Sequence, residues 1–220
     1  MKKLLLTFVF SFFYVTSASA DLGVNVGVSG QAGLFAASAT ESTGSTVKGN
    51  GTEHGSAGWG SVFLEATMND RFMVGIDYVP AALETDTTET AKDDKRTASS
   101  DAKTMSTNKI QVDFEHLTTL YVGAMLNDNF YIKAGVTTVD VITNESLGTG
   151  ASYGNAELDG NMFGIGYHNA LDNGVFFRFE GNYMNFNGHT VNATGTGADN
   201  SIELRNLDGV SGKLSVGKTF

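Results

Sequence analysis

The sequence has no cysteine, one proline and few charged residues, which make up 17% of its 220 positions. Without cysteine it has no disulfide framework, no thiolate metal site and no cysteine nucleophile. Its 14 basic residues are outnumbered by 24 acidic ones, and nucleic-acid phosphates would repel the resulting net charge of −10. So low a charged fraction is unusual for a soluble domain. Glycine and phenylalanine are plentiful instead, with 27 and 15 residues, and this composition points to a β protein.

The first 20 residues have the three-part pattern of a secretory signal peptide. Lys2 and Lys3 precede a short apolar run over 4–15, and the segment 18–20 (Ala-Ser-Ala) offers a cleavage site. An apolar run of about 12 residues is too short to cross a hydrocarbon core, which needs ~20. We therefore expect cleavage after Ala20 and a single exported domain over 21–220.

The rest of the chain alternates apolar and polar residues in segments typical of half-buried β-strands. In the first segment Val24 and Val26 share one face, whereas Asn25 and Ser29 share the other. Short turns follow the second, fourth and sixth segments, and long polar loops over 40–57, 84–104, 143–157 and 187–199 follow the others. The eight expected strands are 22–37, 58–68, 71–78, 110–126, 130–137, 162–168, 175–183 and 210–220.

A secreted β-sandwich, a lipocalin-like cup and a membrane barrel can all show this alternation. The strict order of short and long connections favours a transmembrane barrel, in which short periplasmic turns alternate with long outer loops. The polar faces combine many glycines with charges of both signs, as a narrow lumen requires. Aromatic residues near the predicted turns suit a girdle at the membrane interface, namely Phe72, Phe130, Tyr167 and Phe176. We predict an all-β, eight-stranded, up-and-down antiparallel transmembrane β-barrel.

With this layout the chain resembles the small eight-stranded bacterial outer-membrane barrels, a group containing the outer-membrane protein A barrel, the X/Ail adhesin-like proteins, the W family and the opacity proteins. The C-terminal Phe220, with Val216 and Leu214 on the same face, adds to the resemblance. Such ends are read by the barrel-assembly machinery in that group, although Lys218 replaces the usual apolar residue. The resemblance implies a place in the bacterial outer membrane, beside its lipid and lipopolysaccharide. Segments 115–120 and 130–136 are faintly similar to the W family.

Charged residues on the polar faces are the candidate site. A strand tilted by ~40° climbs about 2.5 Å along the barrel axis per residue, and counting from the turns places five of these charges in one layer. An eight-stranded interior is just wide enough to be filled by side chains, and an unpaired charge inside it would be costly. We expect a salt-bridged plug, which fits both a structural role and a gate for small solutes. The candidate residues are Glu65, Asp77, Lys133, Arg178, Glu180 and Lys213.

Catalytic and metal-binding motifs are not found in the sequence. His54 and His189 are expected in loops and His168 near a short turn, and none has a serine and an acid that a strand would bring beside it. We therefore expect no enzymatic activity, no cofactor and no metal. His116 falls on the apolar face of its strand, which predicts either a bulge that turns Leu117 outward and shelters His116, or a place near the outer interface.

The sequence thus predicts a non-enzymatic outer-membrane barrel with a plugged, charge-paired lumen. Its expected role is in envelope integrity, with the polar outer loops offering a surface to an extracellular ligand. The alternative is a narrow channel for small or hydrophobic solutes, as in the W family.

Overall fold

The computed structural model describes residues 21–95, 103–148, 150–195 and 199–220. The expected signal peptide, residues 1–20, lies outside the described residues. Regular structure in the described part of the chain is all β. No helix there is long and apolar enough to cross a membrane.

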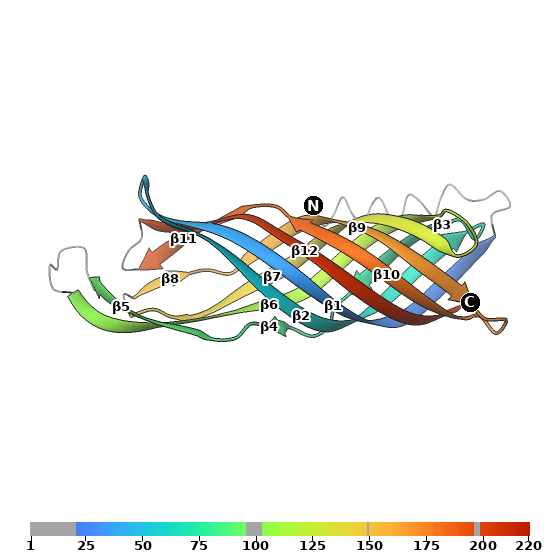
Figure 1. Ribbon diagram of the computed structural model, residues 1–220, viewed down its shortest axis with the longest axis horizontal. Helices are drawn as coiled ribbons and strands as arrows, with labels where there is room; N and C mark the ends of the chain where they lie inside the picture. Colours follow the sequence, from blue (N-terminus) through green and yellow to red (C-terminus); the bar gives the residue numbers. More distant parts are fainter. Residues whose placement is uncertain (1–20, 96–102, 149, 196–198) are drawn as a thin grey trace.

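Eight antiparallel strands close into a ring, because β1 pairs with β12 as well as with β2 (Figure 1). Following register partners round the ring from Asn25 leads back to β1 at Phe35, ten residues further on. A stagger of this kind goes with strands tilted by roughly 35–45° to the barrel axis. The ring strands are β1 (Leu22–Thr43), β2 (Thr46–Met68), β3 (Phe72–Tyr78), β6 (Lys103–Met125), β7 (Phe130–Ser146), β9 (Ala156–Ala170), β10 (Val175–Phe186) and β12 (Asn200–Thr219). The predicted fold class is confirmed.

The two ends of the barrel differ. Short turns join β2 to β3, β6 to β7 and β9 to β10 at one end, here called the turn end, where the C-terminus also lies (Figure 1). In the first of these turns Asn69 and Asp70 both have a φ of 52°, the left-handed conformation of tight hairpin turns. At the other end, here called the hairpin end, several strands extend well beyond the eight-stranded ring (Figure 1).

Much of what the sequence predicts as loop is in fact strand at the hairpin end. β1 and β2 meet in a tight turn at Gly44, so most of the expected loop 40–57 is a hairpin. Three further strands and the short β4 add to it: β4 (Leu83–Glu84), β5 (Thr88–Lys95), β8 (Ala151–Tyr153) and β11 (His189–Gly195). The loop predictions were wrong because backbone hydrogen bonds hold these Ser-, Thr- and Gly-rich strands together, and such strands bury no apolar face that a sequence pattern could reveal.

The outside of the ring is apolar, whereas charged and polar side chains are buried inside it, the reverse of a soluble protein. Large apolar side chains stay exposed along the outer face, among them Leu64 at 51% and Phe179 at 59%. An apolar band of this kind is the lipid-facing surface of transmembrane barrels. Near the turns, Phe72, Phe130 and Tyr167 are exposed as expected. The girdle prediction was wrong for Phe176, because this side chain is fully buried inside the barrel and lies in the lumen.

The bulge expected near Leu117 is present, since the β6–β7 register shifts between Glu115 and Thr118. Its effect is the opposite of the one predicted. Leu117 is buried inside the barrel, and His116, with a φ of 54°, is exposed outside. The extra residue also reverses the alternation beyond it, so that Phe114 packs toward the lumen and Glu115 points outward.

The wall of the barrel is interrupted beside β3. This strand ends at Tyr78, shortly before Pro80, which cannot donate a backbone hydrogen bond. Beyond it the chain follows β6 through β4 and β5, and β2 pairs with β3 only from Val62 onward. Among the described residues, β2 between Thr46 and Ser61 therefore pairs with β1 alone.

Candidate functional site

All six charged candidates lie inside the barrel, brought together from five different strands. They form three ion pairs with one acid and one base each, so that their charges cancel. Each of these residues is at most 8% exposed. We call this group the plug; its pairs are Glu65 with Arg178, Glu180 with Lys133, and Asp77 with Lys213.

The pair nearest the turn end joins Arg178 of β10 to Glu65 of β2. The guanidinium donates from Nη1 to Glu65 Oε2 at 2.9 Å and from Nη2 to Oε1 at 2.7 Å, a bidentate geometry that is among the strongest in proteins. Glu65 also accepts from Asn25 Nδ2 at 2.7 Å and from the Tyr121 hydroxyl at 3.0 Å. The carboxylate is thus saturated with donors, as a buried charge requires.

Arg178 is held from its other side as well. Its Nε donates to His168 Nδ1 at 3.0 Å, and its guanidinium carbon lies 4.6 Å from the centre of the Phe176 ring. An arginine over an aromatic face gains a cation–π attraction. The inward turn of Phe176 therefore supplies a stacking surface for the plug rather than an anchor at the membrane interface.

The second pair joins Lys133 of β7 to Glu180 of β10, with Nζ 2.5 Å from Oε2. The Tyr131 hydroxyl donates to the other carboxylate oxygen of Glu180. Lys133 also lies 5.0 Å from the centre of the Tyr121 ring. Tyr121 thus ties the first pair to the second, because its hydroxyl binds Glu65 and its ring contacts Lys133. Tyr131 does the same in reverse, because its hydroxyl binds Glu180 and its ring centre lies 5.4 Å from the guanidinium carbon of Arg178.

The third pair is formed by Lys213 of β12 and Asp77 of β3. It lies further toward the hairpin end, since Asp77 is two residues beyond Gly75, the register partner of Glu65. Arg178 and Glu180 are likewise two residues apart on β10, a separation of about 5 Å along the barrel axis. The layer expected from residue counting is therefore a stack of three levels.

Several partners of the plug were missed by sequence reasoning. Asn25, Tyr121 and Tyr131 share the inward face with the charged residues of their own strands or neighbours, so strict alternation already contained the signal. Their polar groups were overlooked because asparagine and tyrosine are common on many kinds of face. Only contacts across strands reveal that they complete the carboxylates.

Inward-facing glycines make room for the two tyrosines. A Cβ on Gly166 would lie 2.3 Å from Tyr131 Cζ, and one on Gly75 would lie 2.5 Å from the Tyr121 hydroxyl oxygen. A narrow barrel can hold a ring on one strand only where the facing strand lacks a side chain. These glycines therefore set the position of the ring hydroxyls that bind the plug.

Beyond the plug, toward the hairpin end, the lumen is filled by apolar side chains. Trp59, Leu117 and Met162 are each at most 8% exposed, and Phe35 and Phe114 pack against the same cluster from the side. We call this group the apolar cluster; its buried members are Trp59, Val79, Leu117, Tyr121, Val139, Leu158, Met162, Met184, Phe186 and Leu207. The lumen is thus closed twice, first by paired charges and then by packed apolar side chains.

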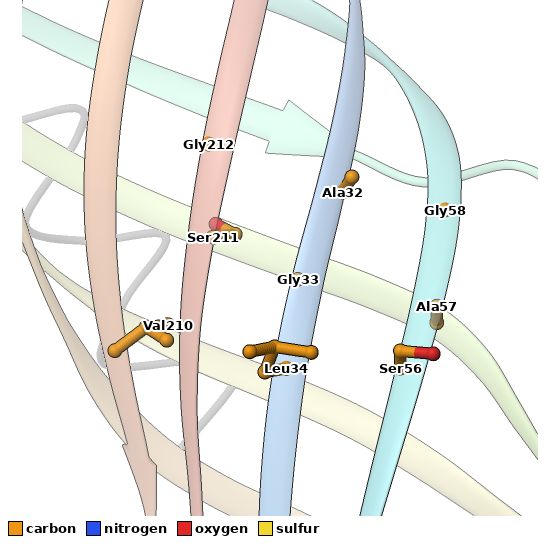
Figure 2. A pocket seen from close by; sticks show the side chains of 9 residues that line it. All are labelled: Ala32, Gly33, Leu34, Ser56, Ala57, Gly58, Val210, Ser211 and Gly212. Atoms are coloured by element: carbon orange, nitrogen blue, oxygen red, sulfur yellow. The ribbon is translucent and has the colours of Figure 1, made fainter.

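A shallow depression lies on the outer face of the barrel. Its volume is about 610 Å³, and it is bordered by Leu34 and Val210. Figure 2 shows the residues that line it. A row of small residues across neighbouring strands forms its floor, with Gly58 next to Ala32 and Ala32 next to Gly212. It lies within the apolar band and presents no charged group, so it offers no chemistry comparable to the lumen.

The four histidines lie on four different strands, β2, β6, β9 and β11. In the described residues no group of three or more histidine or acidic side chains is placed to bind a metal ion. His116 Nδ1 is 3.1 Å from Asp140 Oδ2, but this pair is exposed on the outside of the barrel. The Thr118 hydroxyl beside it donates to a backbone carbonyl, which leaves it bound as part of the bulge.

The closed ring, the outward apolar band and the inward charges define a small transmembrane β-barrel of the bacterial outer-membrane type. In such barrels the short turns face the periplasm and the long connections face the outside. No protein-family model matches the chain, and no curated protein sequence matches it either.

Solved structures share the fold over most of the chain. The outer-membrane protein AlkL, solved by solid-state NMR in lipid bilayers, is 14% identical with a TM-score of 0.52, covering 94% of each chain. OprG from Pseudomonas aeruginosa is 13% identical with a TM-score of 0.50, covering 90% of this chain and 96% of its own. Ail from Yersinia pestis is 11% identical with a TM-score of 0.39, covering 88% and 99%. The fold is that of the small bacterial outer-membrane barrels.

Proposed function

We propose that this protein is a closed, non-enzymatic outer-membrane barrel that contributes to envelope integrity. The observation that carries the proposal is the plug: three buried ion pairs from five strands span the lumen with no net charge. A cross-linked, neutral interior both blocks free diffusion and ties the wall together. The apolar cluster beyond it closes the same path a second time.

The plug makes a direct prediction for conductance across a planar bilayer. The refolded protein should be silent, and Arg178→Ala should open discrete steps because it removes the guanidinium that fills the lumen beside Glu65. Lys109→Ala is the matched control, because Lys109 forms an exposed ion pair with Glu89 at the hairpin end, with both side chains 54% exposed. Heat-modifiable migration on a gel establishes that each sample has folded.

Each outcome of this comparison is informative. A silent wild type beside a conducting Arg178→Ala supports the plug as the barrier. Discrete steps in the wild type would overturn the closed barrel in favour of a channel. Silence in both proteins would show that loss of the Arg178 guanidinium is not enough to open the lumen while the apolar cluster still closes it.

A narrow path for hydrophobic solutes is the second candidate. Two observations favour it: the outer part of the lumen is apolar rather than polar, and the wall is interrupted where β2, between Thr46 and Ser61, pairs with β1 alone among the described residues. An apolar molecule that displaced the apolar cluster could leave sideways before it met the plug. Uptake of a fluorescent apolar probe into proteoliposomes tests this, with Met162→Lys expected to abolish uptake and Lys109→Ala to preserve it. Uptake no faster than in protein-free vesicles would exclude the path.

The hairpin end is the proposed surface for an extracellular ligand, and outer-membrane lipid and lipopolysaccharide are the proposed neighbours of the band. Acidic side chains outnumber basic ones on the exposed β1–β2 hairpin and on the segment that includes β4, where Glu53, Glu84 and Asp86 are all exposed.

The C-terminal residues Leu214, Val216 and Phe220 are exposed on one face of the barrel wall, at 63%, 41% and 73%. This exposure supports their proposed reading by the barrel-assembly machinery.

A further inference from the structure

A small cavity separates the plug from the apolar cluster. Its volume is about 20 Å³, and every ring strand contributes at least one residue to its lining. A cavity needs roughly 10 to 15 Å³ to hold one water molecule, so this one has room for a single water. Polar and charged groups surround it, including Asp77, Lys133 and Lys213 from the plug. A polar cavity of this size holds water, whereas an apolar one stays dry.

Two buried polar atoms at this cavity have no protein partner among the described residues. They are the indole Nε1 of Trp59 and the amide Oδ1 of Asn182. Both side chains line the cavity, and the two residues are only 7% and 8% exposed. The Asn182 oxygen lies over Gly164, where a Cβ would come within 2.4 Å of it. A buried donor and a buried acceptor left unpaired at one cavity call for a bridging molecule.

We propose that this cavity binds one water molecule, which accepts a hydrogen bond from Trp59 Nε1 and donates one to Asn182 Oδ1. The ammonium groups of Lys133 and Lys213 supply further donors, since each has three N–H bonds and one hydrogen-bonded acceptor within the plug. A buried water makes about three hydrogen bonds, which this lining provides. The water joins β2 to β10, two strands separated in the ring by β1 and β12.

The single tryptophan makes the site directly observable. In ¹⁵N-labelled protein in lipid nanodiscs, the indole N–H gives one resonance, which Trp59→Phe must remove. We expect a cross-peak between this proton and water in NOE and ROE spectra. In the ROE spectrum the peak should have the opposite sign to the diagonal, which distinguishes a bound water from proton exchange.

Two variants sharpen the test. Asn182→Leu keeps the side-chain volume but removes the acceptor, and we expect the water cross-peak to be lost while the indole resonance remains. Thr119→Val removes the hydroxyl that lines the cavity and could relay exchange, and the cross-peak should survive this change. Three results would overturn the proposal. The wild-type indole resonance could lack a water cross-peak, the cross-peak could have only the sign of exchange, or it could be unaffected by Asn182→Leu.

Discussion

Arg178 and Glu65 lie 113 positions apart in the sequence and form a buried bidentate pair at 2.9 and 2.7 Å. The pair joins β10 to β2 across the lumen, and its acid also binds groups from β1 and β6. Removing one partner of a buried pair leaves the other charge uncompensated, which is far worse than losing both.

We therefore expect Arg178→Ala to lower the free energy of unfolding by about 3 to 5 kcal/mol, the usual cost of breaking a buried ion pair. Urea unfolding in detergent micelles measures this. The double variant Glu65→Gln/Arg178→Met should recover part of the loss, because no unpaired charge remains. Lys109→Ala, at an exposed pair, should change stability by less than ~1 kcal/mol. Equal losses for Arg178→Ala and Lys109→Ala would contradict the structural role of the plug.

Glycines on the two faces of the barrel wall should respond oppositely to alanine. A Cβ on Gly166 would strike the buried ring of Tyr131, whereas nothing lies within 4 Å of a Cβ on Gly181. We expect Gly166→Ala to destabilise the barrel by about 1 to 3 kcal/mol, as overpacking does. Gly181→Ala should be neutral or stabilising by up to ~1 kcal/mol, since alanine loses less entropy than glycine in a strand. The same urea titration compares them, and the reverse order would mean that the two faces are misassigned.

The bulge at His116 predicts a preference for glycine. At a φ of 54° a residue without a Cβ is unstrained, whereas a β-branched residue is strongly disfavoured. His116→Gly should leave stability unchanged or raise it by up to ~1 kcal/mol, and His116→Val should lower it by about 1 to 3 kcal/mol. Both variants lose the exposed pair with Asp140, so their difference isolates the backbone term. Urea unfolding measures both variants, and identical unfolding midpoints would argue against the bulge.

The C-terminus should matter for assembly more than for stability. Phe220 is 73% exposed and buries little in the folded barrel. In cells we expect Phe220→Ala to reduce the amount of folded protein in the outer membrane several-fold, while the purified variant refolds into micelles like the wild type. Fractionation with gel migration provides the first measurement and urea unfolding the second. Lys218→Ala, also on the exposed face, is the matched control and should assemble at least as well as the wild type. A normal amount of folded Phe220→Ala protein in the outer membrane would contradict the proposal that Phe220 is part of the assembly signal.

The sequence alone determined the ring strands and the identity of the charged residues inside them. Alternation with a period of two assigns each residue to a face, so that Lys133 and Arg178 could be placed in the lumen without coordinates. The rule also placed Phe176 on the inward face beside Arg178, but its proximity to a turn was taken as evidence of a girdle. Alternation itself failed at Phe114, where the bulge changed the phase. The strands at the hairpin end were also not predicted, because they are polar, bury no apolar face and leave no periodic signal in the sequence.

Tertiary structure alone decided which charges pair. A strand pattern fixes the direction in which a side chain points, but the partner depends on the stagger of all eight strands and on how the ring closes. The ten-residue stagger brings Glu65 opposite Arg178 and sets Asp77 at the level of Lys213, an outcome that depends on the sum of every register. The orphaned atoms of Trp59 and Asn182 likewise emerge only after packing, because a polar group lacks a partner only once every neighbour has taken its place.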